Sequence, residues 1–212
     1  MPTMPDQFSL PGFDDPPPSP RQAKPPLKPD FNLFLALVPD DEDAPRIHTN
    51  ADALCRPHGL SRRLIAPDRL HISLFGLAAY QTPLPRQEME ALCAKVDTAL
   101  ASLRHPSLPL VFNRVMSFGR PGATKSPPLV LRTDEASEKA LQDLQHVVHL
   151  ALTGKAPGRF TPHMTLLYDP LHFAEQAIEP IVWTARKLVL ILSHVRKSQY
   201  DRLASWGLGA SA

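Results

Sequence analysis

The chain has 212 residues, of which 43% are hydrophobic and 21% charged, and its net charge is +2. That length can bury a core as one domain or two small lobes, and the small net charge excludes a protein that coats nucleic acid by charge alone. No apolar run reaches the roughly 18 residues that cross a bilayer, and the two cysteines, Cys55 and Cys93, fit no disulfide framework.

The chain begins with a proline-rich segment. Residues 1–30 hold ten of the 25 prolines, and such a composition cannot bury enough apolar surface to offset the entropy of ordering. We expect an extended tail at 1–30, followed by a folded domain at 31–212. An alternative role for the tail is that of a peptide ligand for an aromatic groove on a partner.

The folded part alternates predicted strands and helices. Acidic residues at 40–43 favour a helix N-terminus, Thr133-Asp134-Glu135 is typical of an N-cap, and Gly154 is a natural helix stop. In chain order, the pattern predicts a strand at 31–38, a helix through the 40s and 50s, strand 70–78, helix 86–104, strands 108–118 and 128–132, a helix to about 152, and strands 162–168 and 180–193. The two halves share this order, so we expect a pseudo-duplicated α+β fold with two lobes of antiparallel sheet flanked by helices.

A tetrapeptide recurs in the two halves. His71-Ile72-Ser73-Leu74 returns as His163-Met164-Thr165-Leu166, each time after a proline-containing turn signal. Because strand side chains alternate between faces, the histidine and the hydroxyl residue share one face and the apolar residues the other. Each copy therefore predicts a strand that buries one face and presents an imidazole and a hydroxyl on the other.

These motifs resemble those of the 2H phosphoesterases, in particular the 2'-5' RNA ligase-like and RNA 2',3'-cyclic phosphodiesterase branch. The segments at 31–39, 160–166 and 188–193, followed by Tyr200 and the residues 206–208, also resemble that family. The resemblance covers about residues 31–208 and implies a cleft between two lobes in which the motifs face each other. It also implies that a ribose 2',3'-cyclic phosphate is opened to the 2'-phosphate, with joining of ends through a 2'-5' bond as the reverse step.

The motif residues have the chemistry that this reaction needs. Histidine titrates near neutral pH, so His71 and His163 can divide into one base and one acid, although the sequence does not decide which is which. The Ser73 and Thr165 hydroxyls can donate to phosphoryl oxygens in the transition state.

Three further residues are candidates for substrate binding. Arg120 lies in a glycine-containing loop that can meet phosphate, with a solvated loop charge as the alternative. Tyr168 stands where many members of the family carry arginine, and a tyrosine can stack on a base or donate through its hydroxyl. Phe75 follows the first motif and can stack on a base, with a core position as the alternative.

Metal sites have little support in the sequence. His146 and His149 lie three apart on a predicted helix, and Cys55 and His58 have a zinc-like spacing, but neither pair has a matching second set of ligands. We expect no metal and no cofactor.

Two other classes of function remain open from the sequence: a module that binds RNA or a nucleotide in the same cleft without turnover, and a scaffold that recruits partners through its tail. The favoured partner is an RNA 2',3'-cyclic phosphate end or a cyclic nucleotide, since modest charge disfavours long duplex RNA. We also expect a monomer without membrane attachment. The N-terminus lacks a signal-peptide pattern and the cysteines suit a reducing compartment, which favours the cytoplasm.

Overall fold

The computed structural model describes residues 29–60, 63–195 and 197–209. The expected proline-rich tail falls almost wholly outside these residues. The elements in the described part are β1 (Phe31–Leu37), α1 (Asp43–Cys55), η1 (Arg56–His58), η2 (Pro67–Arg69), β2 (Ile72–Tyr80), α2 (Arg86–Leu100), β3 (Leu108–Ser117), β4 (Pro128–Thr133), α3 (Glu135–Thr153), β5 (Met164–Tyr168), β6 (Gln176–Ala185), β7 (Lys187–His194) and β8 (Gln199–Gly207).

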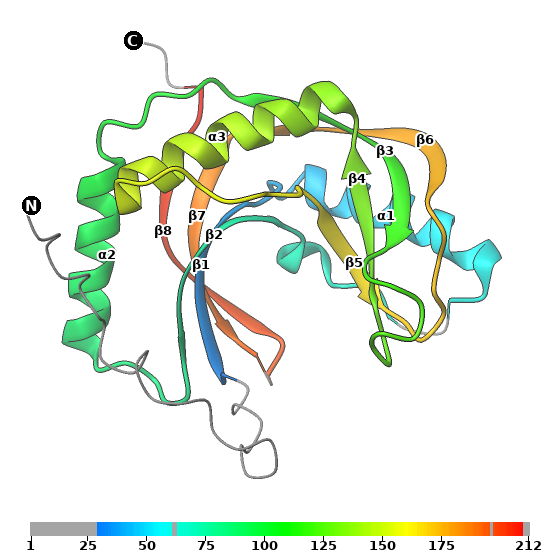
Figure 1. The fold of residues 1–212 in the computed structure, drawn as a ribbon, viewed down its shortest axis with the longest axis horizontal. Helices are drawn as coiled ribbons and strands as arrows, with labels where there is room; N and C mark the ends of the chain where they lie inside the picture. Colours follow the sequence, from blue (N-terminus) through cyan, green and yellow to red (C-terminus); the bar gives the residue numbers. More distant parts are fainter. Residues whose placement is uncertain (1–28, 61–62, 196, 210–212) are drawn as a thin grey trace, which may run out of the picture.

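The strands form two antiparallel four-stranded sheets, which confirms the expected α+β fold with two lobes. The first sheet has the order β2-β1-β7-β8 and the second the order β5-β4-β3-β6. Figure 1 shows the two sheets side by side, with α3 running across the top of both, α2 beside the first sheet and α1 beside the second. The motif-bearing strands β2 and β5 are edge strands of their sheets, and they contact each other.

Local sequence signals account for the longest helix. The Asp134 side chain accepts a hydrogen bond of 2.8 Å from the backbone N–H of Ser137, as an N-cap does. Gly154 ends the helix with a φ of +68°, in the left-handed region that favours glycine. Both ends of α3 lie where the sequence predicts them.

The expected strand at 180–193 is wrong, because this segment contains parts of two strands. β6 pairs with β3 in the second sheet, whereas β7 pairs with β1 in the first sheet. The chain changes sheets at Arg186, whose side chain forms an ion pair of 3.0 Å with Asp40. A single apolar run therefore serves both lobes, and the residues after it form β8 along β7.

Most of the core lies on one face of each sheet and against the three helices. It includes Leu35 and Leu190 from the first sheet, Phe112 and Trp183 from the second, and Leu144 from α3, each no more than 1% exposed. A second, smaller cluster covers the opposite face of the first sheet and consists of Ala36, Val38, Val189 and Ile191, with Phe34 and Tyr200 packed against it. This opposite face is the one that carries the first motif.

Candidate functional site

Each motif histidine immediately precedes an edge strand. His71 leads into β2 and His163 leads into β5. The backbone N–H of Ile65 donates a hydrogen bond of 2.7 Å to the carbonyl of Leu166 in β5. The segment before one motif is thus bonded to the strand of the other, and the two motifs lie at the junction of the sheets.

The side chains alternate as the sequence predicts. Ile72 and Leu74 are 0% and 4% exposed, and Met164 and Leu166 are 0% and 1% exposed. The intervening hydroxyl residues face outward: Ser73 is exposed and Thr165 is half-buried. Within the described part of the chain, neither hydroxyl has a hydrogen-bond partner, so both are available to a ligand.

The two imidazoles are held in the same way. Nδ1 of His71 lies 2.8 Å from the carbonyl oxygen of Arg69, and Nδ1 of His163 lies 3.0 Å from that of Thr161. In each case the carbonyl belongs to the residue two positions upstream. A carbonyl only accepts, so Nδ1 carries the proton and the neutral ring keeps its lone pair on Nε2. Each motif therefore holds an imidazole whose Nε2 can take up a proton.

The environment favours the neutral form of both rings. Burial lowers the pKa of His71 and also that of His163, partly opposed by the hydrogen bonds to the two carbonyls. The charge of His163 and that of Arg69 lower the pKa of His71 further, and Arg132 does the same for His163. The charge of His163 acts on His71, and the strands β2 and β5 that follow the two histidines contact each other, so both imidazoles lie at the junction of the two sheets.

Aromatic rings surround His71. The ring of Phe34 lies 5.2 Å from the imidazole between centroids, and the ring of Tyr200 lies 5.5 Å from it. The guanidinium carbon of Arg69 lies 4.8 Å from the centroid of Tyr200, which is a cation–π contact. Residues from β1, η2 and β8 thus form the surroundings of the first histidine.

The surroundings of His163 are built on the same plan. Phe118, which follows β3, lies 4.5 Å from the imidazole between ring centroids. The guanidinium carbon of Arg132 in β4 lies 5.9 Å from the centroid of Phe118. Nη2 of Arg132 donates to Glu138 at 2.8 Å, so this cation has a carboxylate partner.

The three predicted substrate-binding residues differ in position. Tyr168 is 55% exposed at the end of β5. Burial raises the pKa of Tyr200 and Tyr168 raises it further, which places the two tyrosines near each other. Arg120 is exposed in the loop after β3, two residues beyond Phe118. Phe75 packs against the core and against His149 on α3, with ring centroids 5.1 Å apart, so the structure does not bring it to the histidine pair.

Five residues around the histidines were not identified as site residues from the sequence. Arg69 had a usable signal, because it lies in the turn that leads into the first motif. The others come from strands or loops distant in sequence and had none: Phe34, Phe118, Arg132 and Tyr200.

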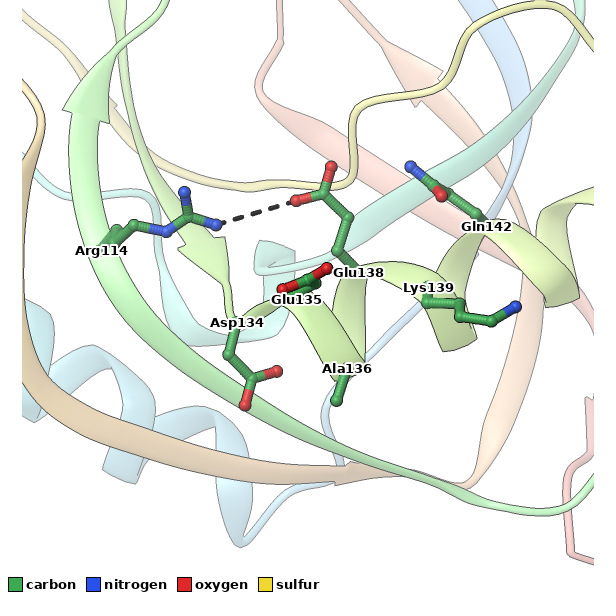
Figure 2. A pocket seen from close by; sticks show the side chains of 7 residues that line it. All are labelled: Arg114, Asp134, Glu135, Ala136, Glu138, Lys139 and Gln142. Atoms are coloured by element: carbon green, nitrogen blue, oxygen red, sulfur yellow. Dashed lines mark ion pairs between the residues drawn. The ribbon is translucent and has the colours of Figure 1, made fainter.

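A cavity of about 1050 Å³ lies away from the histidines, at the start of α3 (Figure 2). Arg114 lines this cavity and lies 3.8 Å from Glu138, which also lines it, and 3.1 Å from Glu175. Because Glu138 also binds Arg132, this network fixes the cation beside Phe118. The acidic side chains in the first turn of α3 make the cavity a poor site for an anion.

Two features are absent from the described residues. No group of three or more histidine, cysteine or carboxylate side chains is arranged there to hold a metal ion. No helix in that part of the chain is both long and apolar enough to cross a membrane.

Burial raises the pKa of the Cys55 thiol to about 11, so this cysteine is a protonated core residue at neutral pH.

The sequence model of one protein family matches residues 32–196, and that family is described as the 2'-5' RNA ligase superfamily. No curated protein sequence matches the chain.

Several solved structures share the fold. Escherichia coli LigT complexed with NADP+ is 20% identical, covers 86% of this chain and 99% of its own, and has a TM-score of 0.59. The same protein complexed with 3'-AMP is 19% identical, with coverages of 86% and 100% and a TM-score of 0.58. TT0787 of Thermus thermophilus is 18% identical, with coverages of 85% and 100% and a TM-score of 0.57. At these identities the likeness extends to the fold alone.

Proposed function

Because the chain belongs to the 2'-5' RNA ligase superfamily of 2H phosphoesterases, as the match over residues 32–196 shows, we propose that it opens ribose 2',3'-cyclic phosphates to 2'-phosphates. Membership in this superfamily implies phosphoesterase catalysis. The proposal adds the cyclic substrate, the paired-histidine mechanism and independence of a metal ion.

One observation carries the proposal. His71 and His163 are neighbours, and each donates Nδ1–H to a carbonyl two residues upstream, which leaves Nε2 for proton transfer. A hydroxyl follows each histidine by two residues on the same face of its strand. Opening a phosphodiester needs two proton-transfer groups, a base and an acid on opposite sides of phosphorus. The repeated arrangement supplies one histidine for each role.

The proton transfers balance within this pair. One neutral histidine takes a proton from water as the water oxygen bonds to phosphorus. The bond between phosphorus and the ribose 3' oxygen breaks, and the second histidine, protonated at the start, gives its proton to that oxygen. Ser73 and Thr165 donate hydrogen bonds to the non-bridging oxygens. When the 5'-hydroxyl of a second RNA end takes the place of water, its oxygen bonds to phosphorus and gives its proton to the neutral histidine. The bond between phosphorus and the ribose 3' oxygen breaks as before, so the two ends are joined through a 2'-5' bond.

The favoured substrate is a short single-stranded RNA end or a nucleotide. The net charge of +2 supplies little attraction for a long duplex. Structures of E. coli LigT contain NADP+, ATP, 3'-AMP or phosphate, and these ligands support a nucleotide substrate for the shared fold. We place Tyr168 and Arg120 at the edge of this site and leave Phe75 out of it. We also propose that the enzyme acts as a monomer in the cytoplasm.

The test is turnover of each nucleoside 2',3'-cyclic phosphate in the presence of EDTA, with products separated by chromatography. We expect the 2'-phosphate from the wild type and almost none from His71→Ala or His163→Ala. His146→Ala, at an exposed position of α3, is the matched histidine control. Binding without turnover in the wild type would replace the enzyme by a binding module, and normal turnover in either motif variant would refute the paired mechanism.

A further inference from the structure

Arg69 contributes to the site with both its backbone and its side chain. Its carbonyl holds Nδ1 of His71, and its guanidinium lies over the ring of Tyr200, 4.8 Å from the centroid. The ring of Tyr200 in turn contacts His71 in an edge arrangement. The guanidinium is therefore held by an aromatic surface beside the first histidine.

The arginines beside the two histidines differ in their ion pairs. Arg132, beside His163, is bound to Glu138 at 2.8 Å. Arg69 has no carboxylate partner among the residues that the structure describes. The Nε of both arginines is buried without a hydrogen-bond partner, so the missing ion pair is what distinguishes Arg69. A half-buried cation without a counter-ion is costly unless an anion accompanies it.

The charges around Arg69 leave room for an anion. Burial lowers the pKa of His71, which favours its neutral form, and burial raises the pKa of the Tyr200 hydroxyl, which favours its protonated, uncharged form. Tyr168 approaches Tyr200 from the second sheet. The strand of the second motif thus supplies no cation of its own at that position.

We propose that Arg69 binds the phosphate of the substrate, with Tyr200 holding its guanidinium in position. This inference rests on the proposed function, which it deepens by naming the residue that recognises the charged group. A guanidinium suits a phosphate because it donates two parallel hydrogen bonds to two oxygens. An anion next to Arg69 would lie within reach of His71 Nε2 and of the Ser73 hydroxyl, which share that side of the first sheet.

The first experiment measures binding of adenosine 2'-phosphate by calorimetry, so that it does not depend on turnover. We expect Arg69→Met to weaken binding by about tenfold or more and Arg69→Lys to weaken it less, since lysine keeps the charge but not the paired hydrogen bonds. Arg86→Met is the matched control, because it removes one positive charge at a side chain that is 91% exposed on α2. Equal affinity in Arg69→Met and wild type would overturn the proposal.

A second measurement separates recognition of the anion from a structural role. The carbonyl that holds His71 belongs to the backbone, so Arg69→Met leaves that hydrogen-bond acceptor in place. Burial is the largest cause of the lowered pKa of His71, and the charge of Arg69 lowers this pKa further. Removal of the Arg69 charge should therefore raise the pKa of His71, and an NMR titration of the imidazole measures this change. Tyr200→Ala should lose more affinity than Tyr200→Phe, because the ring holds the guanidinium. If all nucleotides bind but none is turned over, the proposed function fails while Arg69 is still tested.

Discussion

The backbone N–H of Ile65 donates to the carbonyl of Leu166 at 2.7 Å, and this bond joins the lead-in of the first motif to the strand of the second. It connects the segment before β2 with β5, and the edge strands β2 and β5 belong to different sheets. The two motif strands are not paired in one sheet, so this bond is one of the contacts that set the relative position of the two histidines.

We expect Ile65→Pro to reduce turnover more than it reduces stability. Proline has no N–H to donate, so the Leu166 carbonyl loses its partner at a cost of about 1–3 kcal/mol. A shift of the two imidazoles relative to each other by about 1 Å would lower kcat by about 10²-fold. Thermal unfolding and turnover measured together test this. Ile65→Ala keeps the N–H, and a similar loss of kcat in that variant would contradict the role of the hydrogen bond.

The two histidines act as one unit in the proposed mechanism, so their losses should not add. Each single alanine variant should lose about 10²- to 10⁴-fold in kcat/KM. The double variant should fall little further, because removing either proton-transfer group already disables the unit. Steady-state kinetics on the three variants decide this. Multiplication of the two single losses in the double variant would mean that the histidines act independently.

Local sequence patterns predicted the parts of this structure that depend on neighbouring residues. The alternation in both motifs and both ends of α3 follow from side-chain periodicity and capping, and the structure confirms them. The single strand expected at 180–193 was wrong because β6 and β7 are both apolar and only Arg186 separates them. Hydrophobicity shows that a segment is buried, but not in which sheet.

Phe75 shows how a small irregularity redirects a side chain. Strict alternation puts it on the same face as Ser73, where it would face a ligand. In the structure Ala36 is paired with Ser73 but Leu35 is paired with Phe75, so the register shifts between them. This bulge turns Phe75 toward α3. The neighbours of His71 depend on contacts between residues even farther apart in the sequence. Phe34 and Tyr200 lie beside His71 only because β1 pairs with β7 and β7 pairs with β8.

The hydroxyls of the motifs should matter for catalysis and little for stability. Neither Ser73 nor Thr165 has a partner in the described part of the chain, so removal breaks no hydrogen bond there. Loss of one donor to the developing charge should lower kcat by about 10²-fold in Ser73→Ala or Thr165→Val. Thr165→Ser restores the donor and should restore most of the rate. Unchanged kcat in both deletions, measured with saturating substrate, would exclude a role in the transition state.

The last prediction concerns pH. Catalysis in either direction needs one histidine neutral and the other protonated, and burial lowers the pKa of both below the usual value of about 6.5. Protonation of the first ring also opposes protonation of the second, because the two charges repel each other.

The singly protonated pair is then most abundant below about pH 6.5. As the pH rises above the higher pKa of the pair, the acid is lost and kcat/KM should fall by about tenfold per pH unit. As it falls below the lower pKa, the base is lost and kcat/KM should fall again. A profile of kcat/KM against pH in wild type and Arg69→Met tests this: the maximum should move to higher pH when the Arg69 charge is removed, because that charge adds to burial in lowering the pKa of His71. A wild-type maximum on the alkaline side of neutrality would contradict a pair of buried, neutral histidines.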